Sequence, residues 1–114
     1  MTDADSRDPL RALAAMRCRP GAVRLTADEL GRRLAELPGW SHVDDRIEKT
    51  FLFPDYDRTI AFVNAVAALA QREDHHPDLG VHFDRCVVAW STHSAGGITL
   101  NDCICAAKVE AVGR

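Results

Sequence analysis

The chain has 114 residues, of which 46% are hydrophobic and 27% are charged, and its formal net charge is -3. This length and composition are typical of one folded globular domain with a single core. The slightly acidic balance lacks the positive field that holds nucleic acid nonspecifically, so we expect no direct nucleic-acid partner.

No apolar run approaches the roughly 20 residues that cross a bilayer, and the first residues do not have the pattern of a secretion signal. We therefore expect a cytoplasmic chain with no membrane association. An organelle transit peptide is the alternative. Four early arginines favour it: Arg7, Arg11, Arg17 and Arg19. Three early aspartates oppose it: Asp3, Asp5 and Asp8.

Residues 1–21 are interpreted as a flexible N-terminal extension, because Arg-Pro-Gly at 19–21 separates a short helical possibility around Leu10 to Met16 from the rest. The folded domain is predicted over residues 22–114. Its first helix begins at a capping box of Thr26 and Glu29 and ends before Pro38.

Two strands are predicted next, in WSHV and RIEKTFLF, with a tight turn at Asp44 and Asp45. A long helix then begins at Asp55 or Asp57 and runs to about Glu73. One apolar stripe on this helix consists of Ile60, Val63, Ala67 and Ala70. A second stripe, named here the Phe62 stripe, consists of Phe62, Val66 and Leu69. So wide an apolar surface exceeds what one sheet face covers, so we predict that the Phe62 stripe is exposed and contacts a second copy.

The last third of the domain contains an extended segment around Val81 to Phe83 and a stronger strand from Cys86 to Thr92. A glycine loop and a second capping box, Thr99 with Asp102, precede the final helix. The order α-β-β-α-β-β-α predicts an α+β fold, a two-layer sandwich with helices on one face of a four-stranded antiparallel sheet.

Three histidines are predicted at element ends, where side chains face clefts rather than cores. In EDHHPDLG, residues 73–80, Pro77 disfavours helix at the residue before it, so His75 and His76 leave the long helix in different directions. His93 follows the last strand and opens onto the glycine loop.

From Leu25 to Ala111 the sequence resembles the pterin-4a-carbinolamine dehydratase family. The resemblance rests on GW before the first strand, FLFPDY, HHPD, and STH followed by AGG, Thr99 and Asp102. Thirteen residues separate Pro77 from Ser91. The combination at these distances is specific, whereas His-His-Pro alone is a weak signal.

The resemblance implies dehydration of a 4a-hydroxytetrahydropterin, the product of aromatic amino-acid hydroxylases, to quinonoid dihydropterin. An acid protonates the leaving hydroxyl and a base takes a ring proton, which imidazoles do near neutral pH without metal or organic cofactor. By the same resemblance, His75 and His93 are the acid and base, His76 holds the substrate and Asp102 supports the histidines. The implied substrate contacts are Pro77, Ser91, Thr92 and Gln71.

Simpler interpretations stand beside these roles. Asp102 could serve only as the capping partner of Thr99, and His76 could cap helix carbonyls. His42 and His82 lie outside the motif and are expected on the surface. The four cysteines are expected to be thiols: Cys18, Cys86, Cys103 and Cys105. We expect no metal site, because Cys103 and Cys105 point to different faces of a helix.

The sequence departs from the family pattern at Leu79 and Val81, where many members have tryptophan and asparagine, and at Gln71, where glutamate is common. These changes affect the pocket edge and leave the three histidines intact. The family also implies a homodimer or homotetramer. A rival interpretation is a dehydratase-like binding or assembly module, because some relatives act as dimerisation cofactors of a transcription factor.

Overall fold

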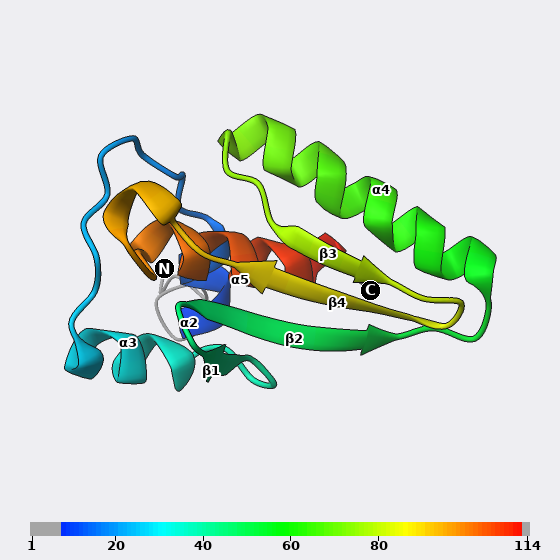
Figure 1. The fold of residues 1–114 in the computed structure, drawn as a ribbon, viewed down its shortest axis with the longest axis horizontal. Helices are drawn as coiled ribbons and strands as arrows, with labels where there is room; N and C mark the ends of the chain where they lie inside the picture. The colour runs from blue at the N-terminus through cyan, green and yellow to red at the C-terminus, as the bar shows by residue number, and fades with distance from the viewer. Residues whose placement is uncertain (1–7, 113–114) are drawn as a thin grey trace, which may run out of the picture.

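The computed structural model describes residues 8–112 and has two layers (Figure 1). One layer is a four-stranded antiparallel sheet in the order β1-β2-β4-β3. Its strands are β1 (Ser41–Val43), β2 (Arg46–Leu52), β3 (Asp78–Val81) and β4 (Arg85–Trp90). The helices are α2 (Pro9–Ala14), α3 (Ala27–Leu34), α4 (Tyr56–Glu73) and α5 (Leu100–Val112), with a 3-10 turn, η1 (His93–Ala95), before α5. The predicted α+β sandwich is confirmed.

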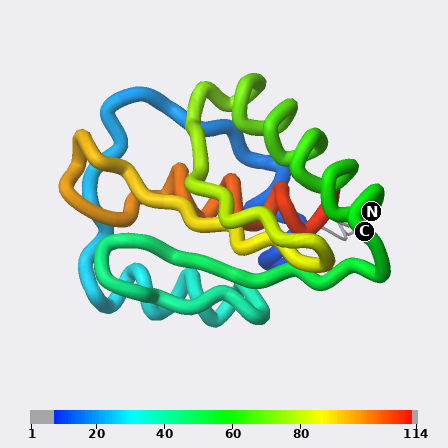
Figure 2. The backbone as a smooth tube through the Cα atoms, turned by 45° about the vertical axis from the view of Figure 1, so that its right-hand side comes forward, coloured from blue at the N-terminus to red at the C-terminus, as the bar shows by residue number. Residues whose placement is uncertain are grey.

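The core lies between the sheet and the two long helices, which pack against each other and against β4 (Figure 2). Ile47 of β2 pairs with Trp90 of β4, and both are fully buried. From the helices, Val66 and Ile104 fill the same core cluster. The central strand β4 therefore packs within the sheet and against the helices. The residues after Trp90 start from a fixed position.

The first predicted elements form as their local signals indicate. The Thr26 hydroxyl accepts from the Glu29 amide at 3.2 Å, and the Glu29 carboxylate accepts from the Thr26 amide at 2.8 Å, so both halves of the capping box are present. Asp44 takes a left-handed conformation, φ 53°, in the predicted turn between β1 and β2. This conformation is tolerated by aspartate and allows a tight reversal.

The prediction for the Phe62 stripe is wrong. Phe62, Val66 and Leu69 are 3%, 0% and 0% exposed and face the sheet. Phe62 lies between Phe51 and Phe53, with ring centroids 4.8 and 5.0 Å away. The stripe therefore belongs to the core of a single chain, and it is Ile60, Val63 and Ala67 that lie partly or largely in solvent.

Strands β3 and β4 each lie slightly N-terminal of their predicted ranges. β3 begins directly after Pro77 and ends at Val81, because the His82 amide bonds to the Arg85 carbonyl at 2.9 Å and forms the turn. β4 ends at Trp90 because the Thr92 amide instead bonds to the Gly97 carbonyl at 2.9 Å. That bond closes η1, which the sequence did not predict.

The N-terminal segment also differs from its interpretation as a flexible extension. Within the described part, the Asp8 side chain caps α2, and Leu13 is only 1% exposed in the common core. Lys108 of α5 donates to the Ala14 carbonyl at 2.7 Å. Residues 8–14 are thus attached to α5, whereas residues 1–7 lie outside the described residues. No helix of the described residues is long and apolar enough to cross a membrane.

Candidate active site

His75 is directed by the way α4 ends. Asp74 adopts a left-handed conformation, φ 51°, so the chain turns sharply after Glu73 and does not continue the helix. The His75 amide still bonds to the Ala70 carbonyl at 3.1 Å. Its imidazole stacks on the Trp90 ring, with centroids 5.5 Å apart and planes 10° from parallel. The ring is therefore fixed by α4 on one side and by the end of β4 on the other.

Asp102 is the hub of the site and is completely buried. Its Oδ1 lies 2.6 Å from His75 Nε2. Its Oδ2 accepts from the Thr92 hydroxyl and from the Thr99 amide, each at 2.8 Å. Three groups therefore contact one carboxylate, so both oxygens of this buried side chain have hydrogen-bond partners.

The donors around Asp102 also define the hydrogen positions. Because a carboxylate oxygen accepts hydrogen bonds, we assign the hydrogen in the contact with Oδ1 to His75 Nε2, which leaves Nδ1 as the acceptor. The Thr92 hydroxyl gives its hydrogen to Asp102, so Thr99 donates to Thr92 across their 2.9 Å contact. The result is a fixed tautomer of His75 with a basic nitrogen facing away from the hub.

Asp102 thereby occupies both positions that the sequence suggested for it, as the capping partner of Thr99 and as a neighbour of His75. Its bond to the Thr99 amide is one half of the predicted capping box, because it covers a free amide at the start of α5. The other half is absent, since the Thr99 hydroxyl bonds to Thr92. The capping bond and the histidine bond use different carboxylate oxygens and exist together.

The second histidine of the pair lies in a different environment. His76 is exposed, and its Nε2 is 2.8 Å from Gln71 Oε1. Gln71 was expected to contact substrate, but in the structure it orients His76. A role for His76 or Gln71 in holding the substrate stays a prediction.

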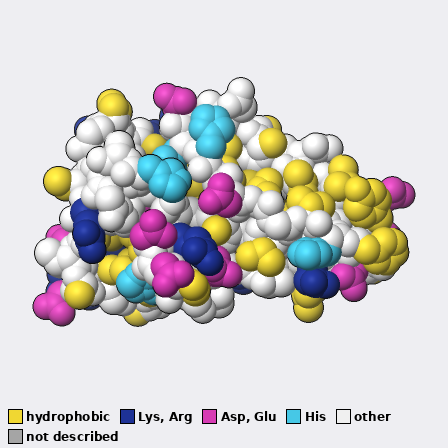
Figure 3. All heavy atoms as spheres, in the orientation of Figure 1, with side chains coloured by type: hydrophobic (Ala, Val, Ile, Leu, Met, Phe, Trp, Pro, Cys, Tyr) yellow, Lys and Arg dark blue, Asp and Glu magenta, His cyan; other side chains and the backbone are white. Residues whose placement is uncertain are grey.

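The remaining expected residues cluster around the end of β4. Ser91 and Thr92 follow Trp90, and His93 opens η1 with its side chain exposed. Thr92 supports Asp102, so a substrate contact of its hydroxyl stays a prediction, as do those of Ser91 and Pro77. Figure 3 shows two histidine side chains close together on the face where α4 ends and η1 begins. His42 and His82 are exposed, as expected.

A polar cavity of about 550 Å³ opens beside this network. His75, Thr92 and Ser94 line one side of it. The opposite wall consists of residues 18–22, which precede α3. His76 and His93 do not belong to this lining. The cavity is therefore lined by both His75 and the N-terminal segment, and not by the two exposed histidines.

A family model described as Pterin 4 alpha carbinolamine dehydratase matches residues 23–112. The chain belongs to this dehydratase family. A relative from Chromobacterium violaceum, named provisionally as a pterin-4-alpha-carbinolamine dehydratase, is 49% identical over 104 residues, which are 90% of this chain and 96% of the relative.

Two solved structures resemble the fold of this family member. The first, from Brucella melitensis, is described as a transcriptional coactivator/pterin dehydratase; it has a TM-score of 0.76 and 34% identity, and covers 80% of this chain and 99% of its own. The second is a pterin dehydratase-like protein described as a RuBisCO assembly factor of the alpha-carboxysome. Its TM-score of 0.54 and 24% identity, over 65% of this chain and 86% of its own, reflect the fold alone.

Sequence reasoning on this dehydratase family member missed Trp90, the contact of the Thr99 hydroxyl with Thr92, and residues 18–22. Trp90 supports His75 by stacking, and Thr99 supports Thr92 through its hydroxyl. Residues 18–22 supply a cavity wall although they precede the family match. Trp90 had a usable signal, since it directly precedes Ser-Thr-His, and the sequence predicted only a capping role for Thr99. Among residues 8–112, no cluster of three or more His, Cys, Asp or Glu side chains could hold a metal ion.

Proposed function

We propose that the chain is a 4a-hydroxytetrahydropterin dehydratase that releases water to give the quinonoid dihydropterin. The observation that carries this proposal is the buried Asp102 carboxylate 2.6 Å from the imidazole of His75. Membership of the dehydratase family supplies the substrate class. In the proposed role, the chain recycles the cofactor of aromatic amino-acid hydroxylases.

The reaction needs two proton transfers and no net change of oxidation state. One group protonates the hydroxyl on C4a so that it leaves as water, and another removes the proton from N5 as the C4a–N5 double bond forms. Proton transfer of this kind requires a donor and an acceptor that titrate near the working pH, and imidazole meets both requirements. We assign these two steps to His75 and His93.

Asp102 suits the role of supporting His75 in either step. As a base, His75 accepts the proton at Nδ1, and the resulting imidazolium is stabilised by the carboxylate at Nε2. As an acid, the imidazolium gives that proton back and returns to the same tautomer. Because Trp90 and Asp102 hold the ring, little reorganisation is needed between the two states.

Stopped-flow decay of a chemically generated 4a-hydroxytetrahydropterin tests this function. We expect acceleration over the spontaneous dehydration in proportion to protein concentration. The variant His82→Ala is a matched control, since this exposed histidine lies in the β3–β4 turn. A decay rate independent of the added protein would remove the enzyme proposal.

A binding or assembly module is the second candidate function. The observation that favours it is the description of the Brucella melitensis relative as a coactivator as well as a dehydratase. A module of this kind would form a stable complex with another protein, and the complex would survive loss of the histidines. Stopped-flow turnover that disappears in His75→Ala supports the enzyme, whereas no turnover together with a stable hetero-complex supports the module.

A further inference from the structure

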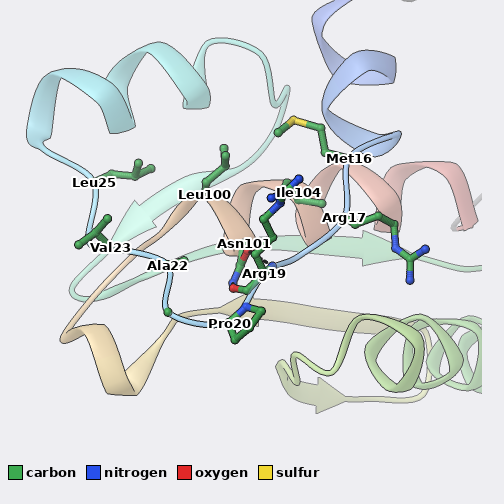
Figure 4. A pocket seen from close by; sticks show the side chains of 11 residues that line it. Met16, Arg17, Arg19, Pro20, Ala22, Val23, Leu25, Leu100, Asn101 and Ile104 are labelled. Carbon is green, nitrogen blue, oxygen red and sulfur yellow. Dashed lines mark hydrogen bonds between the residues drawn. The ribbon is translucent and has the colours of Figure 1, made fainter.

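Residues 16–22 form a strap that leaves α2 and crosses the start of α5 beside the candidate active site. Figure 4 shows the strap passing α5, with Arg19 next to Asn101. The two residues exchange hydrogen bonds, from the Arg19 amide to Asn101 Oδ1 at 3.0 Å and from Asn101 Nδ2 to the Arg19 carbonyl at 2.8 Å. Asn101 directly precedes Asp102, so the strap is attached next to the hub.

The second attachment of the strap is Glu73, two residues before His75. The Cys18 amide donates to Glu73 Oε1 at 2.8 Å, and Arg17 Nε donates to Oε2 at 3.1 Å. Both attachments are polar, and the strap contributes little to the core. Met16, its first residue, and Val23, which directly follows it, are 39% and 82% exposed. A hollow of about 360 Å³ lies on one side of the strap, and the cavity of about 550 Å³ lies on the other.

Segments with few buried apolar contacts open at low free-energy cost. The strap fits this description, because water can replace the hydrogen bonds that attach it when it opens. Opening would remove the wall that faces His75 across the cavity. The position of the strap therefore affects access to His75, and one contact on the strap joins two thiols.

That contact joins Cys18 on the strap to Cys105 on α5, whose sulfurs are 3.4 Å apart. A disulfide is about 2.05 Å long, so closing the bond needs a movement of roughly 1.4 Å. Cys105 is fully buried in a long helix, whereas Cys18 is partly exposed on the weakly attached strap. Cys18 would therefore be the residue that moves. The other two thiols, Cys86 and Cys103, are both completely buried.

We propose that Cys18 and Cys105 are a redox-sensitive dithiol, and that their oxidation to a disulfide locks the strap against α5 as a wall of the site. The oxidant is a hydroperoxide. The Cys18 thiol attacks the peroxide oxygen, giving Cys18 sulfenic acid and an alcohol or water. The Cys105 sulfur then attacks the Cys18 sulfur; the S–O bond breaks, and the hydroxide leaves as water with the Cys105 proton.

The roles of the two sulfurs follow from their surroundings. The hydrogen bond with Cys18, together with burial, raises the pKa of the Cys105 thiol, so this thiol stays protonated and is a poor first nucleophile. Cys18 is the thiol that solvent reaches first. Cys105 then acts as the resolving thiol, for which proximity to the sulfenic acid is the main requirement.

Hydroperoxide treatment of the reduced full chain, followed by unfolding and thiol counting, tests the proposal. The chain has four cysteines, so we expect the count to fall from four to two. The intact mass should fall by about 2 Da, with a peptide that links Cys18 to Cys105. The variants Cys18→Ser and Cys105→Ala should form no intramolecular disulfide. In the matched control Cys86→Ala, the loss of two thiols should persist.

Hydrogen exchange of residues 16–22 provides the test of locking. Oxidation should slow exchange of the strap amides by at least about 10-fold, with no comparable change in α3. Four remaining thiols, a disulfide between two chains or a terminal sulfinic acid at Cys18 would overturn the dithiol. A disulfide that leaves strap exchange unchanged would overturn the lock. None of these readouts depends on dehydratase activity.

Discussion

Asp102→Asn tests the proposed mechanism with the smallest change of shape. The side chain keeps its size, but one carboxylate oxygen becomes an amide group that donates hydrogen bonds. Two donors, the Thr92 hydroxyl and the Thr99 amide, converge on Oδ2, so the remaining oxygen should stay there. The new amide then faces His75 Nε2 at the former 2.6 Å contact.

The changed polarity inverts the tautomer of His75. Nε2 must accept from the new amide, so the proton of the neutral ring moves to Nδ1 and no basic nitrogen faces the substrate. A hydrogen bond to a charged group is worth about 1.5–3 kcal/mol. If that stabilisation acts in the transition state, its loss lowers kcat/KM by roughly 10- to 160-fold, at 1.36 kcal/mol per factor of ten.

Stopped-flow measurement of kcat/KM across pH, with circular dichroism to verify folding, checks this prediction. Asp28→Asn is the matched control, because Asp28 lies exposed in the first turn of α3 and should leave kcat/KM unchanged. A folded Asp102→Asn variant with kcat/KM within about twofold of the unmodified protein would refute the role of the His75–Asp102 bond.

The other predictions concern the histidines, the core, the surface and the strap. His75→Ala and His93→Ala should each lower kcat by roughly 100- to 10,000-fold in stopped flow, whereas His76→Ala should mainly raise KM. Phe62→Asp with Leu69→Asp should abolish cooperative thermal unfolding, because each places an unpaired carboxylate in a core of typically about 5–15 kcal/mol stability. A homo-oligomer stays a prediction. Figure 3 shows hydrophobic side chains gathered at one end of the molecule. Leu52 and Phe83 are large hydrophobic residues that are 77% and 67% exposed, so they are better candidates for a contact between copies than the buried Phe62 stripe, and Leu52→Asp with Phe83→Asp should reduce the mass in light scattering. At Glu73, burial opposes the charged form, but the Cys18 amide, Lys108 and Arg17 outweigh it and lower its pKa below the ordinary 4.5. The stabilisation from Glu73 is therefore complete above that value and is lost as pH falls through the lowered pKa. Acid should therefore lower the protection factors of the strap amides, which compare their exchange with that of an unfolded chain at the same pH, and Glu73→Gln should remove this dependence.

Signals that act within a few residues made the fold largely predictable. Thr26 with Glu29, and Asp55 with the Arg58 amide, cap their helices through bonds that span three residues. The choice between the two stripes of α4 has no such local origin. Both stripes are apolar, and Phe62 is buried because Phe51 of β2 and Phe53, which follows β2, pack against it once α4 folds back over the sheet. Periodicity predicted that α4 is amphipathic but not which stripe faces the sheet.

The attachment of the strap likewise depends on contacts that local sequence signals do not predict. Cys18 contacts Glu73 and Cys105, which lie 55 and 87 positions along the chain. Arg-Pro-Gly at 19–21 is a correct signal for a break in helix, and such a break is compatible with either a free or an attached segment. Only the arrangement of α4 and α5 decides between them, because together they present Glu73 and Asn101 to the strap.

Asp102 links the fold to the candidate site, because one side chain caps α5 and contacts His75. At the start of α5, the Thr99 amide draws Oδ2 toward the helix end, and the helix dipole favours a negative charge there. The donor of this bond is the backbone amide of residue 99 and not its side chain, so the cap itself orients the carboxylate. Oδ1 is then directed at His75, which the left-handed Asp74 and the Trp90 ring hold in position. The residue that caps α5 is thus also the hydrogen-bond partner of the His75 imidazole. It follows that Asp102→Ala would disturb α5 and His75 together. Asp102→Asn would keep the hydrogen bond to the Thr99 amide and change only the hydrogen bond to His75.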